Sequence, residues 1–166
     1  MNPPLEVVEL SKVYNNKQAV KNISFKIDKN QIIGILGPNG CGKTTTIGMI
    51  LGLLKPTKGK VLINGFEIET KRVDLLNELN FISPYIELPK KLTVKQNLEV
   101  YGRLYDVKNL NLKIDYLVEK LRLNEIINRI TGELSSGQKN RVSLAKSIIN
   151  DPTVLLLDEP TASLDP

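Results

Sequence analysis

The sequence predicts an α/β fold with a mostly parallel core sheet, an N-terminal antiparallel β subdomain and a helical insertion. Three observations favour this fold. A strand-like alternation stands near the start, two largely apolar stretches end in a glycine-rich loop and in a pair of acids, and the stretch between them carries apolar residues at helical spacing. Because domains usually run to about 100–200 residues, the chain of 166 residues suits a single domain.

Three strands are expected in the first part of the chain. Residues 19–27 alternate between apolar and polar side chains, which is typical of a half-buried antiparallel strand. Residues 31–36, QIIGIL, are almost entirely apolar, which predicts a strand covered on both faces. Residues 60–65 predict another short strand, and the Asn-Gly pair at its end indicates a turn.

The middle of the chain is expected to be helical. Apolar residues recur every three or four positions after Thr44, after Thr93 and around Leu117. Thr93 and Gln96 form the pattern of a capping box, which marks the start of a helix. We therefore expect a helical subdomain of about residues 84–134 inserted in the domain.

Composition excludes several classes of protein. Hydrophobic residues make up 41% and charged residues 25%, which is typical of a folded chain. The net charge is +5, but the basic residues are scattered and aromatic residues are only 5%, so no nucleic acid partner is expected. A single cysteine excludes an internal disulfide, and no apolar run reaches the roughly 18 residues of a membrane span. These features predict a cytoplasmic chain.

A phosphate-binding loop is predicted at GPNGCGKTT, which lies between an apolar stretch and a helix. Its glycines let successive N–H groups point at phosphate oxygens, and the helix start adds partial positive charge. Lys43 is expected to reach the β- and γ-phosphates, and Thr44 to place its hydroxyl on Mg²⁺. The alternative is a glycine-rich turn capped by a basic residue. The predicted nucleotide-binding residues here are Gly37, Asn39, Gly40, Cys41, Gly42, Lys43, Thr44 and Thr45.

A pair of acids ends the second apolar stretch. A helix over about residues 136–149 is followed by an Asp-Pro break and by the predicted strand TVLLLD, which delivers Asp158 and Glu159 at its tip. Ligands gather at such strand ends in open α/β sheets. Asp158 is expected to hold Mg²⁺ and Glu159 to orient or activate the attacking water. Two acids at a strand end are common by themselves, but the phosphate loop upstream favours the catalytic interpretation.

Together these motifs resemble the nucleotide-binding domain of ATP-binding cassette (ABC) proteins. The phosphate loop, LSSGQ, LLLDEP and SLDP occur in the order of that family, and LSKVYNNKQAV resembles its adenine-contacting opening. The resemblance covers essentially the whole chain. It implies a P-loop NTPase fold of ABC type that binds ATP and Mg²⁺. It also implies a second ABC ATPase domain as partner and separate membrane-spanning permease subunits, at the inner face of the cell membrane.

The resemblance also implies roles for residues outside the two motifs above. Tyr14 matches the aromatic residue that stacks on adenine, although a packing role is the alternative from the residue alone. Ser135, Gly137 and Gln138 match the signature that binds the γ-phosphate of the nucleotide held by the opposite subunit. From the residues alone, Ser135 and Gln138 also fit a plain helix cap. Lys43 and Glu159 are the predicted catalytic residues.

Two departures from the family stand out. Residues 83–85, Ser-Pro-Tyr, replace the stretch where the family has a glutamine that contacts Mg²⁺, so no residue is assigned that role. The chain has no histidine, whereas the family places one after SLDP. In the family the strand after SLDP is central, so we expect a chain truncated before its last core strands, an N-terminal piece of a longer subunit. The alternative is a short protein that completes its sheet by another route.

The resemblance favours an ATPase subunit that powers transport, and the stretch 92–107 is similar to exporters of the ABC-2 or multidrug type. One alternative is an ABC ATPase that acts on ribosomes or DNA rather than in transport. Another is an inactive, truncated nucleotide-binding fragment. We expect this chain by itself to be inactive, and the substrate and the choice between homodimer and heterodimer stay open.

Overall fold

The computed structural model describes residues 2–83 and 87–158. The chain divides into two compact units, Met1–Leu79 and Asn80–Pro166. Within the described residues, no helix combines the length and the apolar composition needed to cross a bilayer.

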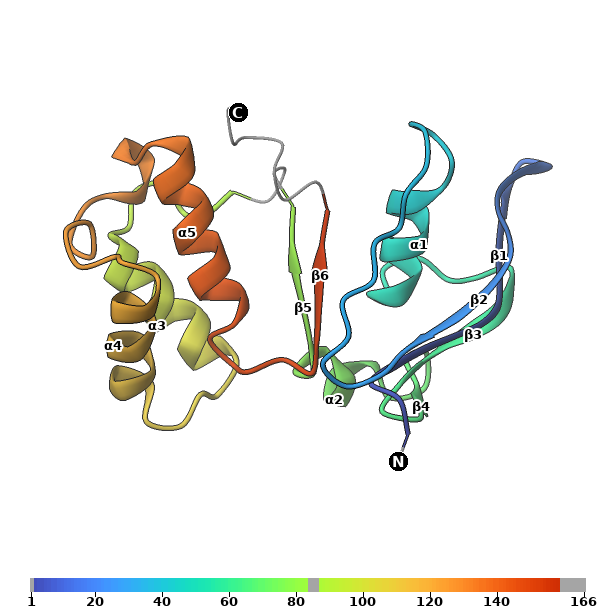
Figure 1. The fold of residues 1–166 in the computed structure, drawn as a ribbon, viewed down its shortest axis with the longest axis horizontal. Coiled ribbons are helices and arrows are strands. Elements are labelled where there is room, and N and C mark those ends of the chain that lie inside the picture. Colours follow the sequence, from blue (N-terminus) through green and yellow to red (C-terminus); the bar gives the residue numbers. More distant parts are fainter. Residues whose placement is uncertain (1, 84–86, 159–166) are drawn as a thin grey trace. The chain divides into compact units, whose positions relative to one another are not determined.

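The first unit is built on a four-stranded antiparallel sheet (Figure 1). Tight turns close both of its hairpins with residues of positive φ, which suit the twist of the strands. The predicted Asn-Gly turn is confirmed, with φ of 52° at Asn64 and 84° at Gly65. The strand order is β2-β1-β3-β4, where β1 is Leu5–Tyr14, β2 is Lys17–Ile27, β3 is Lys58–Ile63 and β4 is Phe66–Glu67.

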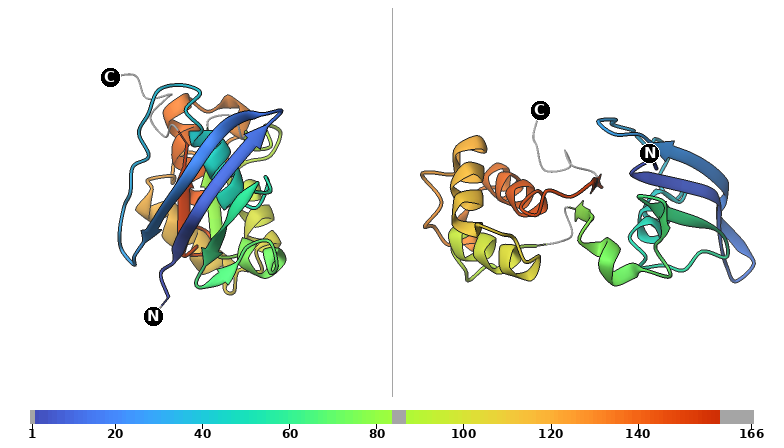
Figure 2. Two further views of the ribbon diagram at one scale, coloured as in Figure 1. Left: turned by 90° about the vertical axis from the view of Figure 1, so that its right-hand side faces the viewer. Right: turned by 90° about the horizontal axis from the view of Figure 1, so that it is seen from below.

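The sheet buries one face, and helix α1, Lys43–Ile50, lies beside it (Figures 1 and 2). The predicted alternation in β2 is confirmed, because Ser24 and Lys26 are exposed while the apolar residues on either side of them are partly buried. A short helix, α2 (Arg72–Leu76), follows the sheet. The most deeply buried side chains of the strands are Leu5, Val7, Leu10, Val61 and Ile63.

Residues 31–36 do not form the buried strand that their apolar side chains predict. No strand in residues 2–83 and 87–158 pairs with them, and Ile32 and Leu36 are 100% and 94% exposed. A strand needs neighbours that satisfy its backbone N–H and C=O groups. The apolar composition therefore indicated that this segment favours a buried strand, but it did not show whether neighbouring strands are present to pair with it.

The second unit combines helices with two short parallel strands (Figure 1). The capping boxes predicted at Thr93 and Ser135 both form, and each begins a helix. The fold class expected from the sequence, an α/β chain with an antiparallel subdomain and a parallel sheet, is confirmed. The elements are β5 (Leu79–Ile82), α3 (Val94–Leu104), α4 (Leu110–Lys120), the 3₁₀-helix η1 (Thr131–Glu133), α5 (Ser136–Ser147) and β6 (Val154–Leu157).

An apolar core holds the helices of the second unit together. Leu98 of α3, Leu117 of α4 and Val142 of α5 have no exposed surface. Burying a large apolar side chain contributes about 1.5–3 kcal/mol, so these helices are held mainly by packing. The buried members of the core are Leu88, Val94, Leu98, Ile114, Leu117, Val118, Leu123, Ile126, Leu134, Val142, Ala145 and Ile149.

The predicted strand before the acid pair forms as β6, but it is less buried than its composition suggests. Val154 is buried, whereas Leu157 is 47% exposed. In the described part of the chain β5 is the strand that pairs with β6, so one edge of β6 is without a neighbour there. The C-terminal end of β6 is therefore exposed in the described part of the chain.

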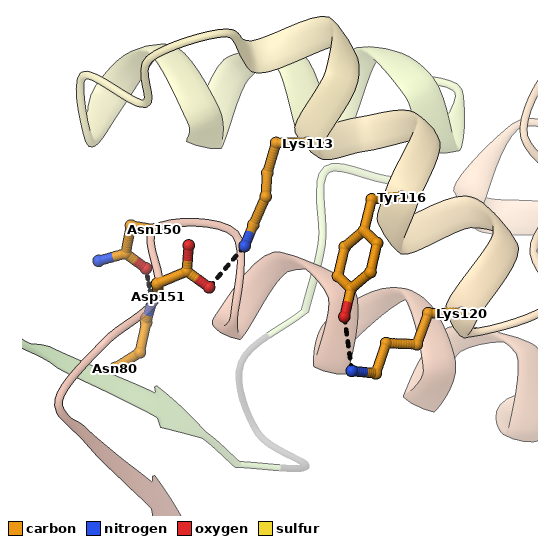
Figure 3. Close-up of polar contacts among 6 residues, drawn as sticks. All are labelled: Asn80, Lys113, Tyr116, Lys120, Asn150 and Asp151. Carbon is orange, nitrogen blue, oxygen red and sulfur yellow. Dashed lines mark hydrogen bonds and ion pairs between the residues drawn. The ribbon is translucent and has the colours of Figure 1, made fainter.

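Polar contacts hold Asn150 and Asp151, in the middle of the connection between α5 and β6 (Figure 3). The Asn80 side-chain N–H donates to Asn150 Oδ1 at 2.7 Å, and the Tyr105 hydroxyl donates to Asn80 Oδ1 at 3.2 Å. Burial, and then the nearby Tyr101, raise the pKa of Tyr105, so its phenol stays a donor. Lys113 of α4 pairs with Asp151 at 2.5 Å. The start of β5, the helices and the residues before β6 are thus tied to one another.

Leu117→Ala is predicted to destabilise the second unit by about 2–5 kcal/mol, because it leaves a cavity in the helical core. Leu112→Ala on the same helix removes the same atoms from a side chain that is 70% exposed, and is expected to change stability by less than about 0.5 kcal/mol. Urea denaturation followed by circular dichroism measures both. Equal stabilities of the two variants would contradict the core assignment.

Candidate nucleotide-binding site

The predicted phosphate loop, residues 37–42, curls between an irregular segment and the start of α1. Gly40 and Gly42 adopt φ of 79° and 97°, which side chains other than glycine rarely tolerate. Within the curl, the Cys41 N–H donates to the Pro38 carbonyl at 3.3 Å. Positive φ at these two glycines turns the chain sharply here, and the phosphate-binding role of the loop stays a prediction.

Gly42 is also the point where the loop touches the antiparallel sheet. A Cβ atom at this position would lie 2.4 Å from the Ala19 carbonyl oxygen and 3.1 Å from Val20 Cγ2 of β2. Such distances leave no room for a side chain, so glycine is needed here for space as well as for conformation. The contact fixes the start of α1 against β2.

The start of α1 is not capped. The Thr46 N–H makes the first helical hydrogen bond, to the Gly42 carbonyl at 2.8 Å, so the N–H groups of Lys43, Thr44 and Thr45 have no acceptor inside the helix. Gly42, the N-cap residue, has no side chain to supply one. By contrast, α3 and α5 both begin with capping boxes. The start of α1 therefore offers unsatisfied donors and the positive end of a helix dipole to an anion.

Lys43 lies across the loop. Its ammonium donates to the carbonyl oxygens of Gly37 at 2.7 Å and Pro38 at 3.0 Å, and lies 4.0 Å from Cys41 Sγ. The positive charge is thus held against the backbone of the loop. To bind phosphate oxygens, the ammonium must exchange these carbonyl contacts for an anion, which makes stronger charge-assisted hydrogen bonds.

The polar side chains of the loop differ in how free they are. The Thr46 hydroxyl donates to the Gly42 carbonyl at 2.9 Å and is buried, so it is already satisfied. Thr44 and Asn39 are exposed, and Thr45 is half-buried. Thr44 is thus accessible, and its role as a Mg²⁺ ligand stays a prediction.

Tyr14 lies at the tip of the β1–β2 hairpin, and 43% of it is exposed. It pairs with Lys17, and Lys12 pairs with Val20, which is where the glycine loop touches β2. In Figure 1 the hairpin tip and the loop lie at the same end of the first unit. The ring is thus accessible to solvent, and its adenine-stacking role stays a prediction.

The sequence interpretation missed Lys12. Its ammonium lies 5.0 Å from the centroid of the Tyr14 ring and donates to the Lys55 carbonyl at 2.6 Å. The signal was available, because residues two apart in a strand point to the same face. Lys12 makes a cation–π contact with the ring, so it is a candidate site residue to the extent that Tyr14 is one.

The signature residues belong to the second unit and begin α5. Ser135 Oγ accepts the Gln138 N–H at 3.3 Å, while Gln138 Oε1 accepts the Ser135 N–H at 3.0 Å. A Cβ atom at Gly137 would meet nothing within 4 Å, so its backbone is open to approach. Ser136, which replaces a glycine of the family, is helical and does not adopt a positive φ. The helix cap is therefore confirmed, and the phosphate-binding role stays a prediction.

Asp158 follows β6 and is held by its backbone, whose N–H donates to the Ile82 carbonyl of β5 at 2.9 Å. Its side chain is partly exposed. Glu159, the predicted catalytic acid, lies outside the described residues, as do residues 84–86. Ser83, the described residue of the stretch that replaces the family glutamine, is 8% exposed.

The described residues fit Mg²⁺ only together with a phosphate ligand. No group of three or more acid, cysteine or histidine side chains gathers among them to hold a metal ion. Mg²⁺ usually takes one or two protein oxygens and completes its shell with phosphates and water. Thr44 and Asp158 supply ligands of that kind, and that they share one ion stays a prediction.

Comparison with known proteins identifies the family. The sequence pattern of the ABC transporter family matches residues 20–162. The chain belongs to the ABC transporter family. The match includes the phosphate loop, the signature and both acids, whereas Tyr14 lies before it.

Curated relatives of this ABC chain include ATP-binding proteins of export systems. It is 39% identical over 165 residues to the Nod factor export ATP-binding protein I of Rhizobium johnstonii, covering 98% of this chain and 53% of that protein. It is 36% identical over 164 residues to the probable multidrug ABC transporter ATP-binding protein YbhF of Escherichia coli, of which it covers 28%. The chain thus spans about half the length of the Nod factor relatives.

Solved structures confirm the fold of the ABC chain. An ATP-binding subunit of an ABC transporter superposes with a TM-score of 0.88 at 27% identity, covering 98% of this chain and 68% of that one. The cbiO1 protein of Clostridium perfringens, part of the transporter complex cbiONQ, gives 0.86 at 30% identity, with coverage of 99% and 68%. The resemblance predicted from the motifs is therefore confirmed.

Gly42→Ala is predicted to abolish measurable nucleotide binding, because the new Cβ clashes with the Ala19 carbonyl and α1 must shift away from β2. Gly34→Ala is the matched control, since a Cβ there meets nothing within 4 Å and its φ is not positive. Fluorescence titration with a labelled ATP analogue compares the two. Binding by Gly42→Ala at the level of Gly34→Ala would contradict the assigned loop geometry.

Proposed function

We propose that the chain is the ATP-binding and ATP-hydrolysing part of an ABC transporter subunit that powers export through separate membrane-spanning subunits. The observation that carries the proposal is the start of α1, where a glycine loop leaves consecutive N–H groups uncapped. A polyphosphate, with its many anionic oxygens, fits such donors. The names of the relatives, Nod factor export and multidrug transport, support the direction of transport.

In this proposal ATP binds along one end of the first unit. Its phosphates accept hydrogen bonds from the loop and from the first N–H groups of α1, and Lys43 leaves its carbonyl partners to bind the β- and γ-phosphates. Adenine stacks on Tyr14, whose orientation Lys12 restrains. Ring, loop and helix start all belong to the same unit, which favours one ligand contacting all three.

Mg²⁺ accompanies ATP in the proposed site. Thr44 and Asp158 hold the ion, Asp158 through water, and the bound ion supplies positive charge that offsets the phosphates. Glu159 orients or activates the attacking water. The exposed position of Thr44, next to a Thr46 whose hydroxyl is already used, supports the choice of Thr44.

A second ABC ATPase domain completes each site in the proposal. Ser135, Gly137 and Gln138 bind the γ-phosphate of the nucleotide held by that second domain. The open backbone at Gly137 supports this role. ATP thus closes two domains on each other, and hydrolysis reopens them.

We place the assembly on the cytoplasmic face of the membrane, with the permease subunits as partners that receive the motion. The similar cbiO1 protein belongs to a transporter complex, which supports a membrane partner. We also propose that residues 1–166 belong to one ATPase domain with a helical insertion at about residues 84–134. The exposed apolar segment 31–36 favours further strands that pair with it in the longer subunit.

Lys43→Ala is predicted to weaken MgATP binding by about 10- to 100-fold, because a charge-assisted hydrogen bond to phosphate contributes about 1.5–3 kcal/mol. Lys29→Ala removes the same charge from an exposed position of the same unit and serves as the control. Calorimetric titration of the full-length subunit measures both. Equal affinity of Lys43→Ala and Lys29→Ala would remove Lys43 from the site.

Glu159→Gln in the full-length subunit is predicted to keep ATP binding while lowering kcat by at least about 100-fold, since an amide cannot accept the proton of the attacking water. Because the reopening step is lost, ATP should trap the closed dimer. Phosphate release and size-exclusion chromatography measure the two effects. Turnover at the wild-type rate would take the catalytic role away from Glu159.

A further inference from the structure

Two segments that are far apart in the sequence are joined by backbone hydrogen bonds in the second unit. One is residues 88–95, which lead into α3, and the other is residues 127–135, which lead into the signature helix α5. Their backbones also form an antiparallel bridge between Thr93 and Ile130. The backbone bonds are Val94 N–H to Arg129 O (3.1 Å), Lys95 N–H to Ile127 O (2.9 Å), Thr131 N–H to Leu92 O (2.9 Å) and Gly132 N–H to Lys90 O (3.0 Å).

Two buried side chains add further hydrogen bonds between these two segments. Asn97 has no exposed surface, and its Nδ2, which carries two N–H donors, lies within hydrogen-bond distance of four acceptors. These are Thr131 Oγ1 at 2.7 Å and the carbonyls of Thr93 at 3.1 Å, Pro89 at 3.2 Å and Leu92 at 3.4 Å. The Thr131 hydroxyl in turn donates to Leu92 O at 2.9 Å. The four surrounding acceptors require the amide nitrogen on this side. We call Asn97 and Thr131 the clamp.

In Asn97, the amide N–H groups make hydrogen bonds and the amide oxygen makes none within the described part of the chain. Asn97 Oδ1 is buried and has no hydrogen-bond partner among the described residues. A buried unpaired acceptor is costly, and an apolar side chain would avoid it. The Asn97 side chain is thus suited to holding the carbonyls of the incoming segment and the Thr131 hydroxyl in one arrangement.

The chain between the clamp and the residues predicted to contact the γ-phosphate is short. Thr131 begins the 3₁₀-helix that ends at Glu133, buried Leu134 follows, and Ser135 is the N-cap of α5. The Leu134 N–H also donates back to the Thr131 carbonyl at 3.4 Å. Only the rest of this 3₁₀-helix and Leu134 therefore separate the clamp from Ser135.

We propose that Asn97 and Thr131 are positioning residues for the signature, and that they hold the start of α5 in register with the segment that precedes α3. This inference rests on the proposed function, because it concerns closure over the γ-phosphate of a second domain. Asn97 and Thr131 are not among the residues that we propose to bind nucleotide or metal. The clamp sets where the signature residues stand when the two domains meet.

The test uses the full-length subunit with its membrane partner and compares Thr131→Val with Thr131→Ser. Valine keeps the shape but loses the hydroxyl that accepts from Asn97 and donates to Leu92, whereas serine keeps it. Asn97→Asp, which keeps the shape and loses the donors, is the second variant. MgATP affinity, kcat and KM are measured in each, and ATP-driven dimerisation is measured with Glu159→Gln added.

Thr131→Val and Asn97→Asp are expected to bind MgATP within about twofold of the wild type, because the phosphate loop is untouched, and to dimerise at least tenfold more weakly. Thr131→Ser should match the wild type in both. Wild-type dimerisation by both Thr131→Val and Asn97→Asp overturns the proposal, and so does loss of folding in both. A wild-type subunit that fails to bind ATP instead contradicts the proposed function, and the clamp proposal falls with it.

Discussion

The contact between Gly42 and Ala19 is the constraint on which the candidate site depends. It presses the start of α1 against β2 and leaves no room for a side chain, so the helix must begin without a cap. The same contact brings the loop to the part of the sheet that carries Tyr14 and Lys12. One close approach of backbones therefore fixes the uncapped N–H donors at the start of α1.

The helices differ in whether the N–H groups at their starts are capped. At α3 and α5, Thr93 and Ser135 satisfy the first N–H groups internally, which stabilises those helices by about 1 kcal/mol each. At α1 that stabilisation is given up, and Lys43 holds a positive charge over the loop instead. An uncapped helix start beside a cation lowers the stability of the fold without ligand. An anionic ligand that binds there offsets this loss.

Local rules carried most of the sequence prediction. The capping boxes at Thr93 and Ser135, the Asn-Gly turn and the alternation of β2 depend on residues within a few positions of one another, and all are confirmed. The prediction of a buried strand at residues 31–36 was wrong, because a buried strand also needs neighbouring strands, which the composition of the segment does not determine. Nor could any local pattern reveal that Asn97 meets Thr131, since 34 residues separate them and only the fold brings them together. The roles of the site residues stay predictions.

The most direct test of the account is a solved structure of the full-length subunit with Mg²⁺ and a non-hydrolysable ATP analogue. The account predicts phosphate oxygens within about 3.2 Å of the amide nitrogens at the start of α1, with Mg²⁺ beside the Thr44 hydroxyl and the Asp158 carboxylate and adenine on the Tyr14 ring. A nucleotide bound elsewhere, or a metal ion that contacts Thr44 with Asp158 far away, would contradict it.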